Sequence, residues 1–148
     1  VDFVPKSVCT KKAVLDATTN AVTAAGELGH HLAISGDVYL DYPINEDNEL
    51  VVQGTFMFND AGAISANSGI GGFGELGYRW RFIEPVVQFD YFKSDLAKSD
   101  YMGMHFGLNW WIAKHATNFK VDFAMEKTGD VSNAPFIKSV TLQGQLFL

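Results

Sequence analysis

The sequence predicts an all-β protein, an antiparallel up-and-down β-barrel that crosses a membrane with about seven or eight strands in this chain. Segments of about ten residues alternate apolar and polar side chains, and a strand sends alternate residues to opposite faces. That length matches the roughly nine to eleven residues of a tilted strand that crosses a bilayer. Short turns also alternate with longer loops rich in Gly, Ser, Asn and Asp, as in outer-membrane barrels.

Seven complete strands are expected, at residues 30–44, 50–60, 72–82, 85–93, 101–112, 117–127 and 139–148. The turns at 45–49, 83–84 and 113–116 are short, whereas the connections at 61–71, 94–100 and 128–138 are longer. Counting back from the last strand, residues 1–4 fit the end of an earlier strand, and residues 5–29 are predicted to form a long outer loop. Part of this loop, residues 13–25, could instead be a short helix or an eighth strand.

The stub at residues 1–4 favours further strands upstream. Residues 1–148 would then be the C-terminal portion of a larger barrel. The alternative is that they form a single, complete eight-stranded barrel domain.

The two residue sets of these strands differ sharply in polarity. One set is apolar and carries no charge within a strand core, as lipid contact requires, because a charge at mid-bilayer costs about 2–4 kcal/mol. The other set is predicted to line the lumen with Asp37, Asp41, Glu75, Arg79, Arg81, Asp90, His105, Lys120, Asp122 and Glu126. Aromatic residues beside the short turns predict a membrane-interface belt of Tyr42, Trp80, Phe82, Trp110 and Trp111. A soluble sandwich with its apolar face inward would show the same alternation.

Composition narrows the function classes. The chain of 148 residues has a formal net charge of -6, which argues against a nucleic-acid partner. Its single cysteine, Cys9, excludes an internal disulfide, and no apolar run approaches the roughly 18 residues of a membrane helix. His30 and His31 point to opposite faces of a strand, and no serine shares the face of His105 nearby, so no metal site, cofactor or catalytic group is predicted.

A resemblance adds to this interpretation. Residues 107–122 (GLNWWIAKHATNFKVD) resemble the near-terminal hairpin of outer-membrane porins of the phosphate-selective porin O and P family. Residues 75–78 with 83–91, and residues 38–43 with 50–58, are similar to the preceding strands, so the resemblance covers most of the chain from about Gly36 onward. It implies a porin longer than this chain. Two features depart from the family: the terminal aromatic, Phe147, is penultimate, and the lumen set leans acidic, so phosphate selectivity is not carried over.

The expected function is therefore that of an outer-membrane porin of a Gram-negative cell, a passive channel for small hydrophilic solutes or ions. Its partners would be the lipid bilayer and those solutes, with a homo-oligomer as one arrangement, and it would not be an enzyme. The alternative is a small closed outer-membrane barrel that does not conduct and has a structural or partner-binding role. A third possible function is that of a soluble lipid-binding barrel with the apolar face inward.

Overall fold

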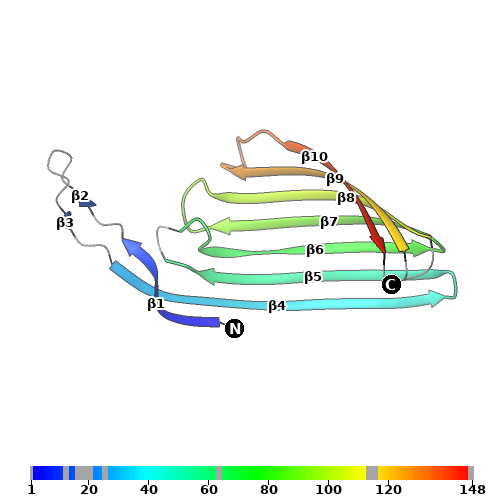
Figure 1. The fold of residues 1–148 in the computed structure, drawn as a ribbon, viewed down its shortest axis with the longest axis horizontal. Coiled ribbons are helices and arrows are strands. Elements are labelled where there is room, and N and C mark those ends of the chain that lie inside the picture. The colour runs from blue at the N-terminus through cyan, green and yellow to red at the C-terminus, as the bar shows by residue number, and fades with distance from the viewer. Residues whose placement is uncertain are drawn as a thin grey trace.

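The computed structural model describes residues 2–11, 14–15, 22–24, 27–62, 65–112 and 117–146, with side chains from residue 29 onward. Eight strands form one antiparallel sheet in the order β1-β4-β5-β6-β7-β8-β9-β10 (Figure 1). They are β1 (Asp2–Lys11), β4 (Glu27–Asn45), β5 (Asn48–Asp60), β6 (Gly69–Trp80), β7 (Ile83–Ser94), β8 (Asp100–Trp111), β9 (Thr117–Gly129) and β10 (Ile137–Leu146). The short strands β2 (Val14–Leu15) and β3 (Val22–Ala24) pair separately. Within these residues there is no helix that is long and apolar enough to cross a membrane.

The seven strands β4 to β10 run up and down, each pairing with the next in the chain, which confirms the predicted antiparallel meander. Their bounds lie within a few residues of those expected from the alternation. One turn differs: Trp80 pairs with Ile83, so Arg81 and Phe82 form the turn that was expected at 83–84. Arg81 has a φ of 56°, which ends the strand there because a strand needs negative φ. Phe147, Leu148 and the turn at 113–116 lie outside the described residues.

The N-terminal segment contains more strand than expected. The strand that residues 1–4 suggested continues as β1 to Lys11, and it pairs antiparallel with β4, for example through Phe3 and Leu32. The next long strand already begins at Glu27. The prediction of an outer loop at residues 5–29 is therefore wrong for residues 5–11 and 27–29, which lie in β1 and β4, while β2 pairs with β3 between them.

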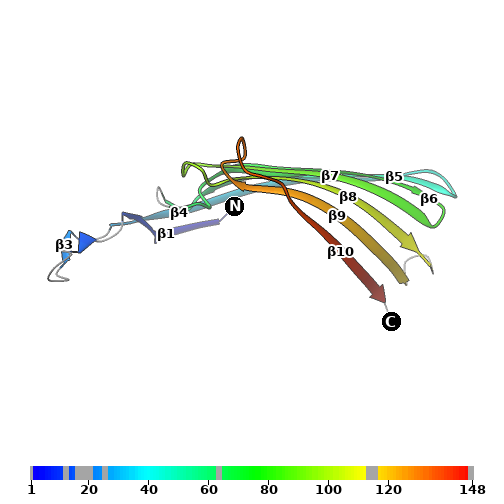
Figure 2. The same cartoon turned by 90° about the horizontal axis from the view of Figure 1, so that it is seen from above.

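The described sheet is open and curved. β1 and β10 are its two edge strands, so these strands do not form the closed barrel that the sequence predicted. Figure 2 shows that β8, β9 and β10 bend progressively away from the plane of β5 to β7, which gives the sheet a concave and a convex face. The concave face is the one turned toward the viewer in Figure 1, where β10 passes in front of the other strands.

The sheet has almost no apolar core. Ala124 is the one buried hydrophobic residue among the described residues, whereas large apolar side chains such as Leu76, Val87 and Phe106 are about half exposed. The chain exposes 10069 Å², while a compact monomer of 16.3 kDa would expose about 7,500 Å². Much apolar surface therefore remains uncovered when this chain is taken as a single molecule.

Candidate functional site

The convex face carries a continuous apolar surface. Strand register places one outward-facing apolar residue of each strand at the same level, in direct cross-strand pairs: Leu40, Val52, Leu76, Val87, Phe106, Phe123 and Val140. One level of aromatic residues near the turns contains Trp80 and Trp110, paired through Ile83. We define the apolar band as the outward-facing residues at these two levels, together with the outward-facing residues of β7 between residues 83 and 91 and their cross-strand partners.

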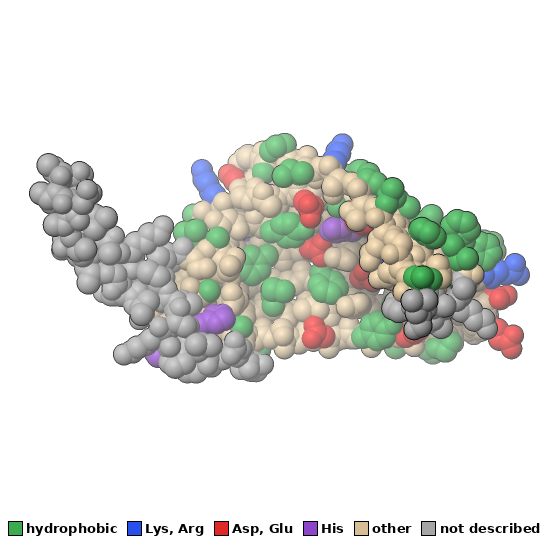
Figure 3. All heavy atoms as spheres, viewed as in Figure 1, with side chains coloured by type: hydrophobic (Ala, Val, Ile, Leu, Met, Phe, Trp, Pro, Cys, Tyr) green, Lys and Arg blue, Asp and Glu red, His purple; other side chains and the backbone are tan. Residues whose placement is uncertain are grey.

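The concave face is polar and less exposed. Along β6 to β9 most of the apolar residues of the convex face are exposed, while most of the residues alternating with them are half-buried or buried. This difference follows from the curvature, because side chains converge on the concave side of a bent sheet. Figure 3, which views this side, shows acidic side chains gathered with a histidine over the middle strands. The concave face is therefore the candidate functional surface.

A histidine bridges two carboxylates at the centre of this face. The Nε2 atom of His105 lies 3.0 Å from Asp90 Oδ2, and its Nδ1 atom lies 3.0 Å from Asp122 Oδ2. A neutral imidazole carries one N–H, so it can donate only one of these bonds, whereas an imidazolium donates both. The amide of Gln88 donates a further bond of 2.7 Å to Asp90 Oδ1. The three strands β7, β8 and β9 are thus linked by side-chain polar contacts at the middle of the concave face.

Glycine makes room for this bridge. A Cβ atom at Gly103 would lie 3.0 Å from Asp90 Oδ2, and one at Gly107 would lie 3.8 Å from Asp122 Oδ1. Both glycines flank His105 on the same face of β8, since residues two apart in a strand share a face. The absence of a side chain at Gly103 therefore lets Asp90 reach the imidazole, whereas the space at Gly107 would accommodate a Cβ atom.

A second polar cluster lies at the turn end of the face. Arg79 forms an ion pair with Glu49 of the adjacent strand, and its guanidinium carbon lies 5.8 Å from the centre of the Trp111 ring. The indole N–H of Trp111 donates a 2.7 Å hydrogen bond to Glu84 Oε2, which keeps this buried carboxylate partnered. The charge of Arg79 is therefore largely balanced by acids beside it.

At the loop end, a hydroxyl and an ammonium hold acidic side chains. Tyr101 donates a 2.8 Å hydrogen bond to Glu126 Oε1 on the concave face. On the convex side, beyond the apolar band, Lys93 Nζ lies 2.7 Å from Asp100 Oδ2. This hydrogen bond from Lys93 holds the pKa of the Asp100 carboxyl below its ordinary value, and the same bond raises the pKa of the Lys93 ammonium.

The predicted lumen residues fall into three groups. Strand parity places most of them on the concave face, at Asp37, Glu75, Arg79, Asp90, His105, Lys120, Asp122 and Glu126. Glu75, Lys120 and Asp122 line a small cavity of about 130 Å³. Asp41 shares this parity and, like Asp37, is exposed on β4, near the open side of the sheet. Arg81 lies in a turn, with Nε 3.4 Å from Asp47 Oδ2, so it extends from the rim rather than from the wall.

The predicted interface aromatics also divide. Tyr42, Trp80 and Trp110 are exposed on the convex face near the turns, and Phe82 is exposed in a turn. Trp111 faces the concave side instead, because it follows Trp110 directly in the strand and binds Glu84. Trp111 thus belongs to the polar concave face and not to the apolar band.

Sequence reasoning missed several concave residues. Glu49 and Glu84 were assigned to turns, but the strands begin early enough to bring both onto the concave face. Extending the alternation by two residues would have found them. Met57, Phe92 and Tyr101 also face inward, and parity alone carried that signal, because their residue types gave none.

This arrangement fixes charges rather than presenting a reactive group. Both nitrogens of His105 face carboxylates, so neither is directed at a hydroxyl that it could activate. Within the described residues, no group of three or more His, Cys, Asp or Glu side chains is arranged to hold a metal ion.

Comparison with known proteins identifies no relative of this chain. No protein-family model matches the chain, and neither the curated proteins nor the solved structures searched contain a significant match. The chain is thus defined by its class, an all-β antiparallel meander with one polar and one apolar face.

Proposed function

We propose that this chain forms the wall of an outer-membrane β-barrel porin, a passive channel for small hydrophilic solutes and ions. The observation that carries the proposal is the curvature of the sheet, which turns the polar face inward and leaves the apolar band exposed on the convex side. A barrel in lipid needs this arrangement, with apolar residues outward and polar residues toward the lumen.

The dimensions of the apolar band support a membrane span. On β7 the outward-facing residues from 83 to 91 carry no charge, and Lys93 follows beyond them. Nine residues cover about 30 Å along a strand, or about 23 Å along the membrane normal at a tilt of about 40°. Outer-membrane barrels have an apolar band of about 25 Å, so the two heights agree.

Closure of the barrel requires partners for both edges of the sheet. An unpaired edge leaves backbone N–H and C=O groups without hydrogen bonds, which is costly in hydrocarbon. Further strands would therefore join β1 and β10, either from the same polypeptide or from other copies. The mass of the protein extracted from its native membrane distinguishes these cases, because a value well above 16.3 kDa supports a longer chain.

The charge of the wall favours cations. The acids on the concave face are Asp37, Asp41, Glu49, Glu75, Glu84, Asp90, Asp122 and Glu126. Against them stand Arg79, which is paired with Glu49, and Lys120, together with the bridging His105. Acidic walls attract cations and repel anions, so we propose a preference for small cations over anions.

Ion currents across a planar bilayer test the proposal. The reversal potential in a salt gradient should indicate cation preference, which Glu75→Gln should reduce and Lys120→Gln should increase. The matched control is Lys138→Gln, because Lys138 lies at the exposed start of β10, on the convex parity. A folded, inserted protein that conducts no ions would refute the porin and support the closed, non-conducting barrel instead.

A further inference from the structure

The concave face has an apolar patch that the porin proposal does not use. Near its loop end lies a cavity of about 790 Å³, lined by Met57, Phe92 and Tyr101 among others. A smaller cavity of about 190 Å³ shares these three residues and adds Phe73. Apolar side chains on the polar side of a sheet need an explanation, since this surface otherwise carries amides, hydroxyls and charges.

Two glycines let the aromatic rings lean across the sheet. A Cβ atom at Gly71 would lie 2.7 Å from Phe92 Cδ2, so the Phe92 ring covers the position that a side chain there would occupy. A Cβ atom at Gly103 would lie 2.6 Å from the Tyr101 hydroxyl oxygen in the same way. The hydrogen bond from Tyr101 to Glu126 fixes the second ring. The two rings and Met57 therefore form a fixed apolar floor.

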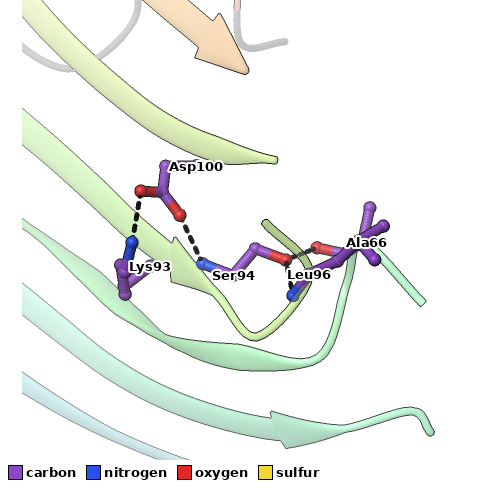
Figure 4. A network of polar contacts seen from close by, with 5 residues as sticks. All are labelled: Ala66, Lys93, Ser94, Leu96 and Asp100. Carbon is purple, nitrogen blue, oxygen red and sulfur yellow. Dashed lines mark hydrogen bonds and ion pairs between the residues drawn. The ribbon is translucent and has the colours of Figure 1, made fainter. Parts of the chain in front are cut away.

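Ala66 and Asn67, in the connection between β5 and β6, line the cavity beside this floor. Asn59 Nδ2 donates a 2.7 Å hydrogen bond to the carbonyl oxygen of Asn67, and Ser94 Oγ donates a 2.8 Å bond to that of Ala66. Asn59 and Ser94 both belong to the concave face, so Ala66 and Asn67 are held against this face. Figure 4 shows the Ser94 contact beside the Lys93–Asp100 pair, which braces the same end of β7 and β8.

The lining of the larger cavity is neutral but able to form hydrogen bonds. None of its lining residues carries a formal charge. Ser35, Asn67 and Ser99 line it, and the side chains of these three make no hydrogen bond with any other described residue, so they can bind a ligand. A charged solute would lose hydration here without gaining a counter-charge, and a purely apolar solute would leave these groups unsatisfied.

We propose that this cavity binds a neutral, polyhydroxylated ring, a sugar, which sets one apolar face on Phe92 and Tyr101 and turns its hydroxyls toward Asn67, Ser35 and Ser99. The inference rests on the proposed function only in taking the concave face as the channel wall. Binding should be weak, roughly millimolar, because a site within a channel must release its solute.

Saturation-transfer NMR on the intact protein in lauryldimethylamine oxide micelles tests this site without requiring a pore, and this detergent has no sugar head group to compete. The probes are glucose, glucuronate and glucosamine, which share a ring and differ in charge. We expect saturable binding of glucose, with strong transfer to its ring C–H protons, and at least about tenfold weaker binding of the two charged sugars. Equal binding of all three would overturn the neutral site.

Variants then locate the site. Phe92→Ala should weaken glucose binding about tenfold, whereas Phe89→Ala, the same change on the same strand and the opposite face, should leave it unchanged. Asn67→Ala, in a loop where the sheet does not depend on the side chain, should weaken it several-fold. Folded wild-type protein that binds no glucose, or equal effects of Phe92→Ala and Phe89→Ala, would refute the proposal. Glucose binding without ion conduction would instead leave the site standing and refute the pore.

Discussion

The placement of the apolar band in lipid can be tested by adding one positive charge at three positions of β7. Val87 lies at the centre of the apolar band and is 51% exposed on the convex face. Val87→Arg should cost about 2–4 kcal/mol, because an arginine at the bilayer midplane has this penalty. With RT near 0.59 kcal/mol, the ratio of folded to unfolded protein should fall by about 30- to 900-fold.

Two further variants separate the face from the depth. Gln88 is adjacent to Val87 but half-buried on the concave face, opposite Glu75 and bonded to Asp90. Gln88→Arg should therefore change stability by less than about 1 kcal/mol, since the new charge meets acids and the lumen. Ile83 shares the face of Val87 but lies at the turn end, so Ile83→Arg should cost about 0–1 kcal/mol.

Equilibrium urea unfolding from lipid vesicles, followed by tryptophan fluorescence, gives the three free energies. Val87→Arg and Gln88→Arg of equal cost would refute the assignment of the two faces. Equal costs for Val87→Arg and Ile83→Arg would refute the bilayer as the surrounding medium, because a soluble apolar core has no such dependence on depth.

Three further outcomes follow from particular contacts. Gly71→Val should destabilise the sheet by about 1–3 kcal/mol, because its Cβ would meet backbone of β7 at 2.6 Å, while Gly74→Val should be tolerated in the same unfolding assay, since nothing lies within 4 Å. Asp100→Asn should lower Tm near neutral pH but not at strongly acidic pH. Because the pKa of Asp100 is lowered, its bond with Lys93 stabilises the fold at pH values above the ordinary pKa of the carboxyl. This contribution is lost as the pH falls through the lowered pKa. His105→Ala should increase cation preference in bilayer recordings by removing the hydrogen-bond donor that lies between two carboxylates, and an unchanged reversal potential would contradict this.

Strand positions were predictable because alternation repeats over many residues. The pattern located β4 to β10 within a few residues, and parity alone places Glu75, Asp90 and His105 on one face. Strand ends were less predictable, because turn geometry depends on contacts with neighbouring strands. Arg81, for example, leaves the strand where its backbone N–H bonds the carbonyl oxygen of Asp47 in the adjacent turn.

The arrangement of the concave face needed the three-dimensional structure. His105, Asp90 and Asp122 lie on three different strands, and register decides that the two carboxylates reach the two ring nitrogens. The apolar floor of Met57 and Phe92 also depends on register, because it brings Gly71 between them. Sequence distance carries no information about such cross-strand neighbours.

The sequence by itself determined the class of structure, an antiparallel meander with one apolar and one polar face, because the period-two pattern is local and a strand converts it directly into two surfaces. It did not determine which face is concave, since a sandwich and a barrel share the same alternation. The tertiary structure decided this through curvature: β8, β9 and β10 bend so that the polar side chains converge and the apolar side chains spread apart on the convex side. Curvature is the sum of twists and contacts between many strands, so no single segment of the sequence specifies it.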